Sequence, residues 1–131
     1  MNLKIHHIGY VIKKMNSSIE EFERIGFTKE TITYDEIRKA EICFMNKDGY
    51  CIELVSPSKE SDLYELMKKC KNMAYHICYL VDNLNESVKI FEESGYFLFK
   101  EEEAAPAIGQ DARVVFLINQ DVGIVELLQL Q

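Results

Sequence analysis

The chain has 131 residues, of which 47% are hydrophobic and 28% are charged, and its formal net charge is −7. This length and composition predict one globular domain. The acidic balance argues against broad binding to nucleic acids or anionic membranes, which requires basic surfaces. Because the sequence also lacks a membrane-spanning apolar run and a secretory signal pattern, we expect a cytoplasmic protein.

The first half of the chain predicts a strand, a helix and three further strands. Residues 4–12 are apolar, aromatic and β-branched without a helical period, which is typical of a buried strand. A helix follows, with Asn16 or Ser17 as its expected N-cap and Gly26 as its expected stop. The next strands are predicted at residues 30–34, 39–45 and 50–55.

The second half repeats this order after a polar linker that carries a short predicted helix. When residues 7–26 are laid on residues 76–95 without a gap, His7 falls on His76 and Gly26 on Gly95. The second copy predicts a strand at 74–81, a helix capped by Asn85 or Ser87, and strands at 96–100, 113–118 and 123–128. We therefore expect a single domain, residues 1–131, made of two βαβββ modules at about 3–56 and about 73–131, with the linker at about 57–72.

Four cysteines, Cys43, Cys51, Cys70 and Cys78, form no C-x-x-C pair, and three of them lie in strand-like runs. A cytosolic thiol stays reduced, and a buried cysteine packs as a small hydrophobic residue. We therefore predict buried free thiols rather than disulfides.

Glu53 and Glu126 each stand in the middle of an otherwise apolar strand, one in each copy. Burying an unpaired carboxylate is costly, so such a residue usually has a cation beside it or a raised pKa. A simpler interpretation is that each glutamate points to solvent from a one-sided sheet. The presence of one glutamate in each copy, each matched by a histidine at the start of its module, favours metal ligation.

The repeat also distinguishes between two neighbouring histidines. His7 aligns with His76, whereas His6 aligns with Tyr75 and points to the opposite face of its strand. A lone strand histidine is more often a hydrogen-bonded structural residue than a ligand, but imidazole is the commonest metal ligand. We predict one divalent-metal site, suited to Ni²⁺, Co²⁺, Zn²⁺ or Mn²⁺, whose ligands are His7, Glu53, His76 and Glu126.

These segments resemble the vicinal oxygen chelate superfamily, and within it glyoxalase I and methylmalonyl-CoA epimerase. The resemblance rests on His7-Ile8-Gly9-Tyr10, Ile52-Glu53-Leu54-Val55, His76-Ile77-Cys78-Tyr79 and Val125-Glu126-Leu127-Leu128. It implies an α+β fold in which the two βαβββ modules form a curved, barrel-like mixed sheet, the glyoxalase/bleomycin resistance/dioxygenase fold. It also implies one divalent metal ion per site, with Ni²⁺ or Co²⁺ favoured.

The resemblance further implies an enzyme that moves a proton on the carbon next to a metal-chelated oxygen. It suggests Glu126 as the catalytic base and Glu41 as a further catalytic carboxylate. We favour a glyoxalase I-type lyase that isomerises a thiol–methylglyoxal hemithioacetal. A methylmalonyl-CoA epimerase-like racemase acting on an acyl thioester is the alternative. Residues 117–123, which precede the last strand, lack the motif that is usual there in either enzyme, so they do not distinguish the two substrates. A non-catalytic metal-binding or small-molecule-binding protein is the third candidate.

Residues 101–111 lie between two predicted strands of the second module and are rich in small apolar residues. We expect this segment to border the pocket, although a passive connection is the simpler interpretation. Arg113, at its end, is a candidate contact for a substrate carboxylate or phosphate. The expected partners are a small thioester or hemithioacetal substrate and a second copy in a homodimer, and neither nucleic acid nor membrane.

Overall fold

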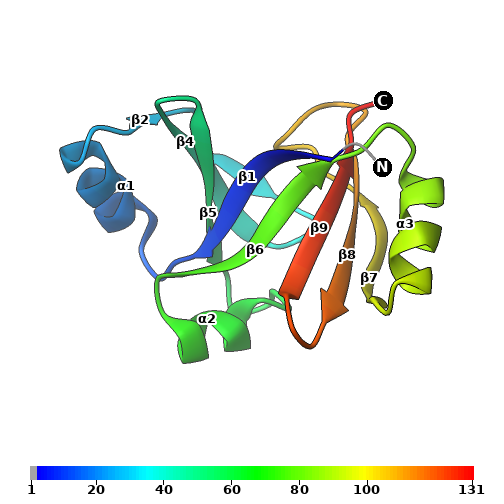
Figure 1. The fold of residues 1–131 in the computed structure, drawn as a ribbon. Coiled ribbons are helices and arrows are strands. Elements are labelled where there is room, and N and C mark those ends of the chain that lie inside the picture. Colours follow the sequence, from blue (N-terminus) through cyan, green and yellow to red (C-terminus); the bar gives the residue numbers. More distant parts are fainter. Residues whose placement is uncertain (1–2) are drawn as a thin grey trace. The chain divides into compact units, whose positions relative to one another are not determined.

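The computed structural model describes residues 3–131, which fall into two compact units. One unit is His7–Tyr75, and the other combines residues 3–6 with His76–Gln131. The element order gives each predicted repeat a strand, a helix and then further strands (Figure 1). The expected α+β class with tandem βαβββ modules is therefore confirmed.

The first module is built on a mixed sheet. Its elements are β1 (Lys4–Val11), α1 (Met15–Arg24), β2 (Thr28–Lys29), β3 (Thr33–Asp35), β4 (Ala40–Lys47), β5 (Tyr50–Pro57) and α2 (Tyr64–Cys70). β1 runs parallel to β5, and β4 pairs antiparallel with β2, β3 and β5. Helix α2 confirms the short helix predicted in the linker, and its buried residue is Met67.

The second module repeats this pairing pattern. Its elements are β6 (Met73–Leu80), α3 (Leu84–Glu93), β7 (Phe97–Ala104), β8 (Arg113–Asn119) and β9 (Gly123–Gln129). β6 runs parallel to β9, β9 is antiparallel to β8, and β8 is antiparallel to β7. In both modules the first strand therefore lies directly beside the last strand, although the two are far apart in sequence.

In each module the helix packs on one face of its sheet. Tyr10 of β1 and Ile12, which follows that strand, join Ile52 and Leu54 of β5 in a cluster with the apolar side of α1. Around α3 the equivalent cluster contains Val81, Leu84, Phe91, Val115, Leu117, Val125 and Leu127. Because side chains alternate along a strand, the residues between these positions face away from the helix.

The predicted strand at residues 30–34 is wrong. Two short strands replace it, with Lys29 opposite Met45 and Thr33 opposite Ile42. The segment from Lys29 to Thr33 is thus one residue longer than the β4 segment that it faces, and an extra residue interrupts a ladder in the way a β-bulge does. The predicted loop at residues 101–111 is also shorter than expected, because β7 extends to Ala104.

Both predicted helix N-caps are wrong. α1 begins at Met15, with Lys14 at the N-cap position and no side-chain capping bond. In α3 the N-cap is Asn83, whose Oδ1 accepts a hydrogen bond from the backbone N–H of Glu86 at 3.0 Å. The two glycines predicted to end the helices have the expected backbone conformation. Gly26 and Gly95 have φ values of 103° and 97°, in the left-handed region that glycine adopts without strain.

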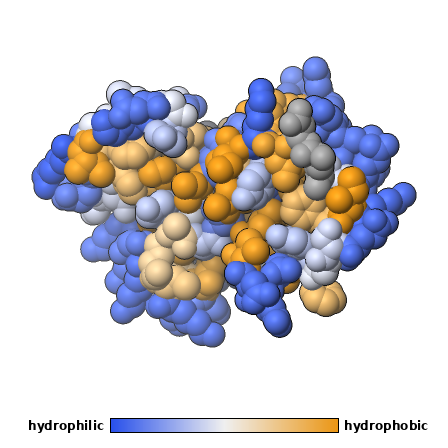
Figure 2. Space-filling view, in the orientation of Figure 1, coloured by the Kyte–Doolittle hydropathy of each residue, from blue (hydrophilic) through white to orange (hydrophobic). Residues whose placement is uncertain are grey.

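The outer surfaces of α1 and α3 are largely hydrophilic (Figure 2), as expected of amphipathic helices with one face on a sheet. All four cysteines are free, as predicted, but only Cys43 and Cys78 are buried, whereas Cys51 and Cys70 are partly exposed. Within residues 3–131, no helix has both the length and the apolar character needed to cross a bilayer.

The difference between the two helix starts gives a stability test. We expect Asn83→Ala to lower the free energy of unfolding by about 1 kcal/mol, because it removes a side-chain cap. The matched control is Lys14→Ala, which removes no capping bond and should change stability much less. Urea denaturation of both variants measures the difference, and equal losses would contradict the assigned cap.

Candidate metal centre

The first module pairs His7 with Glu53. Gly9 lies opposite Glu53 in the parallel ladder between β1 and β5, so His7, two residues earlier, shares the strand face that points away from α1. His7 Nε2 lies 3.3 Å from Glu53 Oε1. The two residues are only 1% and 6% exposed, so both groups are withdrawn from bulk water.

The second module pairs His76 with Glu126 in the same way. Cys78 lies opposite Glu126 in the parallel ladder between β6 and β9, and His76 again stands two residues before that position. His76 Nε2 lies 3.0 Å from Glu126 Oε1, and the two residues are 4% and 3% exposed. Each module therefore builds its own buried imidazole–carboxylate pair by the same register.

A phenylalanine stands beside each pair. Phe44 of β4 is opposite Glu53, and its ring meets the His7 ring edge-on at 5.5 Å between centroids. Phe116 of β8 is opposite Glu126, and its ring meets the His76 ring at 5.3 Å. The sequence analysis missed both phenylalanines. The signal that identifies them is the register of the β4–β5 and β8–β9 hairpins, which brings one of them across from each glutamate.

Residues 6–116 match the model of the Glyoxalase/Bleomycin resistance protein/Dioxygenase superfamily. The chain belongs to this superfamily. The resemblance that the sequence indicated is thereby confirmed, and a search of curated protein sequences gave no significant match.

Several solved structures share the fold of this chain at low sequence identity. A hypothetical protein from Bacillus halodurans C-125 matches with a TM-score of 0.87 and 19% identity, over 100% of this chain and 96% of that one. Methylmalonyl-CoA epimerase from Mycobacterium tuberculosis gives 0.82 and 16%, over 97% and 87%. The Streptomyces coelicolor epimerase, solved with 2-nitronate-propionyl-CoA, gives 0.81 and 18%, over 97% and 94%. At these identities the likeness shows the fold alone.

The donor chemistry of each pair fits a divalent cation of the kind that the superfamily commonly binds. Imidazole nitrogen and carboxylate oxygen suit first-row divalent metals, and a cation offsets the cost of burying a carboxylate. Burial, with smaller contributions from Glu30 and Glu53, raises the pKa of the nearby Cys51 thiol to about 11.

The loop after β7 packs on the strand face that carries the second pair. Ala105, Ala112 and the partly buried Ile108 form a cluster with Cys78 and Leu128. Cys78 shares its face with His76, and Leu128 shares its face with Glu126, because each lies two residues from its neighbour along a strand. The loop thus covers the same side of this sheet as His76 and Glu126, as expected for a segment that borders a pocket.

Two other candidate residues, Glu41 and Arg113, do not lie beside the imidazole–carboxylate pair of their own module. Glu41 is exposed and lies opposite Ser56, three positions along β4 from Phe44, so it faces the α1 side of the sheet. Arg113 lies three positions along β8 from Phe116, hence on the α3 side, and its Nε donates to Glu102 Oε2 at 2.9 Å. Neither position supports a direct role beside the ligand pair of its module.

The contact between Phe116 and His76 gives a test of stability. Edge-on aromatic contacts contribute about 0.5–1.5 kcal/mol beyond buried area, so Phe116→Leu should lower the free energy of unfolding by about 1 kcal/mol. Phe97→Leu is the matched control, because Phe97 is 71% exposed and should change stability by less than about 0.5 kcal/mol. Denaturant titration compares the two variants. A loss at Phe97 as large as that at Phe116 would argue against the ring contact.

Proposed function

We propose that His7, Glu53, His76 and Glu126 together bind one divalent cation, with Ni²⁺ or Co²⁺ favoured and Zn²⁺ or Mn²⁺ as alternatives. The observation that carries this proposal is the matched pair of buried imidazole and carboxylate in each module. Each pair supplies two donors, whereas a protein metal site uses three or four protein ligands. Sharing one ion between the pairs satisfies both carboxylates and joins residues 1–131 into one functional domain.

The reaction that we propose is proton transfer at a carbon next to a carbonyl or hydroxyl oxygen. When bound, a divalent cation polarises such an oxygen and stabilises the negative charge that develops as the proton leaves. Glu126 is the proposed base, because a carboxylate beside the polarised group is placed to accept that proton. The buried surroundings of Glu126 exclude water, which strengthens its interaction with the cation.

Two substrate classes fit this chemistry. The presence of two carboxylates in the ligand set favours the glyoxalase I-type reaction, the isomerisation of a thiol–methylglyoxal hemithioacetal. The fold comparisons favour an acyl-thioester epimerase, because the matched structures include methylmalonyl-CoA epimerases, one of them solved with methylmalonyl-CoA. Both reactions remove a proton next to a thioester or its precursor, so the proposal is an isomerase that acts on small thiol-linked substrates, in a protein that we expect to be a homodimer.

The metal proposal predicts that either histidine is required for binding. Dialysed His7→Ala and His76→Ala should each lose most of the bound Ni²⁺ or Co²⁺, measured by elemental analysis per chain. Glu41→Gln is the carboxylate control and should keep the metal, since Glu41 is exposed on the other face. Stoichiometric metal in both histidine variants would rule out this ligand set.

The proton-transfer proposal predicts a different outcome for the two glutamates. Glu126→Gln keeps an oxygen donor but removes the basic carboxylate, and general-base catalysis typically contributes ~10²–10⁴ in rate. With excess Ni²⁺ or Co²⁺ we therefore expect this variant to bind metal and to lose at least ~10²-fold in turnover. Glu53→Gln, with the same chemical change at a ligand, should lose less.

The assay is loss of the α-proton signal in D₂O, followed by NMR for the hemithioacetal and for methylmalonyl-CoA separately. Exchange with only one of them identifies the substrate class. If both glutamate variants lose activity equally and excess metal restores both, the base is not Glu126. If neither substrate exchanges its proton at full metal loading, the proposed reaction is refuted, whereas the proposed metal site is not.

A further inference from the structure

A cavity of about 500 Å³ opens beside α1, at the end of β1. Its lining comes entirely from the unit His7–Tyr75. Its apolar wall contains Tyr10 and Phe22, whose rings meet edge-on at 5.5 Å between centroids. Its polar rim contains two lysines and two serines, Lys13, Lys14, Ser17 and Ser18. Ligand sites of this size are typically apolar hollows with a few polar groups.

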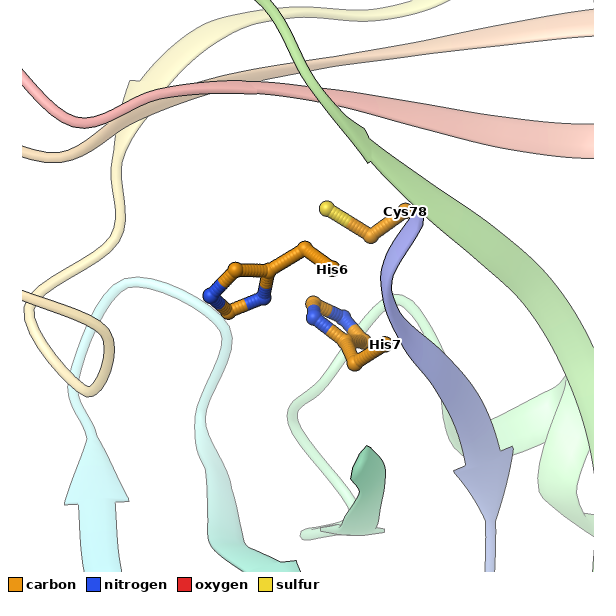
Figure 3. Close-up of side chains that lie close together, drawn as sticks. All are labelled: His6, His7 and Cys78. Carbon is orange, nitrogen blue, oxygen red and sulfur yellow. The ribbon is translucent and has the colours of Figure 1, made fainter. Parts of the chain in front are cut away.

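The cavity lies on the other side of the sheet from His7 and Glu53. Figure 3 shows the His7 side chain projecting from β1, and Tyr10 stands three residues further along the same strand. An odd separation puts two strand residues on opposite faces, and Tyr10 packs with the cluster around α1. A ligand in the cavity would therefore contact neither donor of the first imidazole–carboxylate pair.

The rim of this cavity is basic, although the chain has a formal net charge of −7. Lys13 and Lys14 are both exposed, and within residues 3–131 neither ammonium group forms an ion pair. The carboxylate of Glu21, which also lines the cavity, is paired with Arg24 Nη1 at 2.8 Å. The two lysines therefore produce a local positive potential, which attracts an anion.

The second module does not repeat this rim. Under the alignment of the two repeats, the aromatic residues of the wall recur as Tyr79 and Phe91. The positions of the two lysines and of the first serine instead carry Asp82, Asn83 and Glu86. Packing of the helix on its sheet explains the shared aromatic wall, because these rings belong to the core of each module. It does not explain the basic rim, because both lysines are exposed.

We propose that this cavity binds a small phosphomonoester whose organic part is apolar or aromatic. A phosphate group carries a charge of about −1.5 to −2 at neutral pH and has three strong acceptor oxygens. The two lysines supply the opposite charge, the two serine hydroxyls supply hydrogen-bond donors, and the aromatic wall packs against the organic part. Because the cavity and the first ligand pair lie on opposite faces, this site is independent of the proposed reaction.

Isothermal titration calorimetry of the metal-free protein with phenyl phosphate tests this site. At low ionic strength and slightly alkaline pH we expect saturable binding of one molecule per chain. The affinity should be at least about tenfold higher than that for inorganic phosphate, because the phenyl ring is buried against the aromatic wall. Combining Lys13→Gln with Lys14→Gln should weaken phenyl phosphate binding at least about tenfold, because charge-assisted contacts are lost.

The charge-matched control combines Lys4→Gln with Lys89→Gln, two exposed lysines outside the cavity, and it should bind phenyl phosphate like the wild type. Three results would overturn the proposal: no saturable binding to the wild type, an equal loss of affinity in the two double variants, or no preference for phenyl phosphate over inorganic phosphate. Because every titration uses metal-free protein, failure of the proposed metal site or of the proposed reaction leaves this test unaffected.

Discussion

The two-residue period of a β-strand is the constraint on which both ligand pairs depend. A side chain on a strand faces either the helix or the opposite side, and the apolar residues around α1 occupy the helix side. His7 and Glu53 fall on the other side because β1 and β5 are parallel neighbours in a fixed register. A shift of one residue in either strand would move its ligand into the helix core, so the apolar packing that stabilises each module also fixes its donors.

The duplication makes the two pairs geometrically alike and leaves their surroundings different. The register, the separation between imidazole and carboxylate, and the edge-on phenylalanine are all repeated. Among the described residues, a thiol lies opposite the glutamate only in the second pair, and a loop of small apolar residues packs on the face of that pair. Similar donors in different surroundings can differ in basicity and in access to water.

Much of this arrangement was predictable because it follows from local periodicity and from the repeat. The strand order, the helix positions and the pairing of each histidine with its glutamate all depend on residues that recur in both copies. The interruption near residue 30 and the true caps were not predictable, since they depend on one extra residue and on which backbone N–H a side chain reaches. Glu41 was inferred from the family resemblance and Arg113 from its place at the end of a loop, whereas the hairpin register determines which face each of them occupies.

Metal binding would also link the stabilities of the two modules. Each carboxylate is buried against an imidazole within its own unit, so each unit carries the cost of a charge removed from water. If the proposed cation is shared by both pairs, it would bind only when both units are folded, and at 100 times its dissociation constant it would add about 2.7 kcal/mol to the stability of the folded state. Two carboxylates would balance the charge of one divalent ion, and neutral imidazoles would add none. Such a balance would offset the cost of burying each carboxylate in the core of its own module.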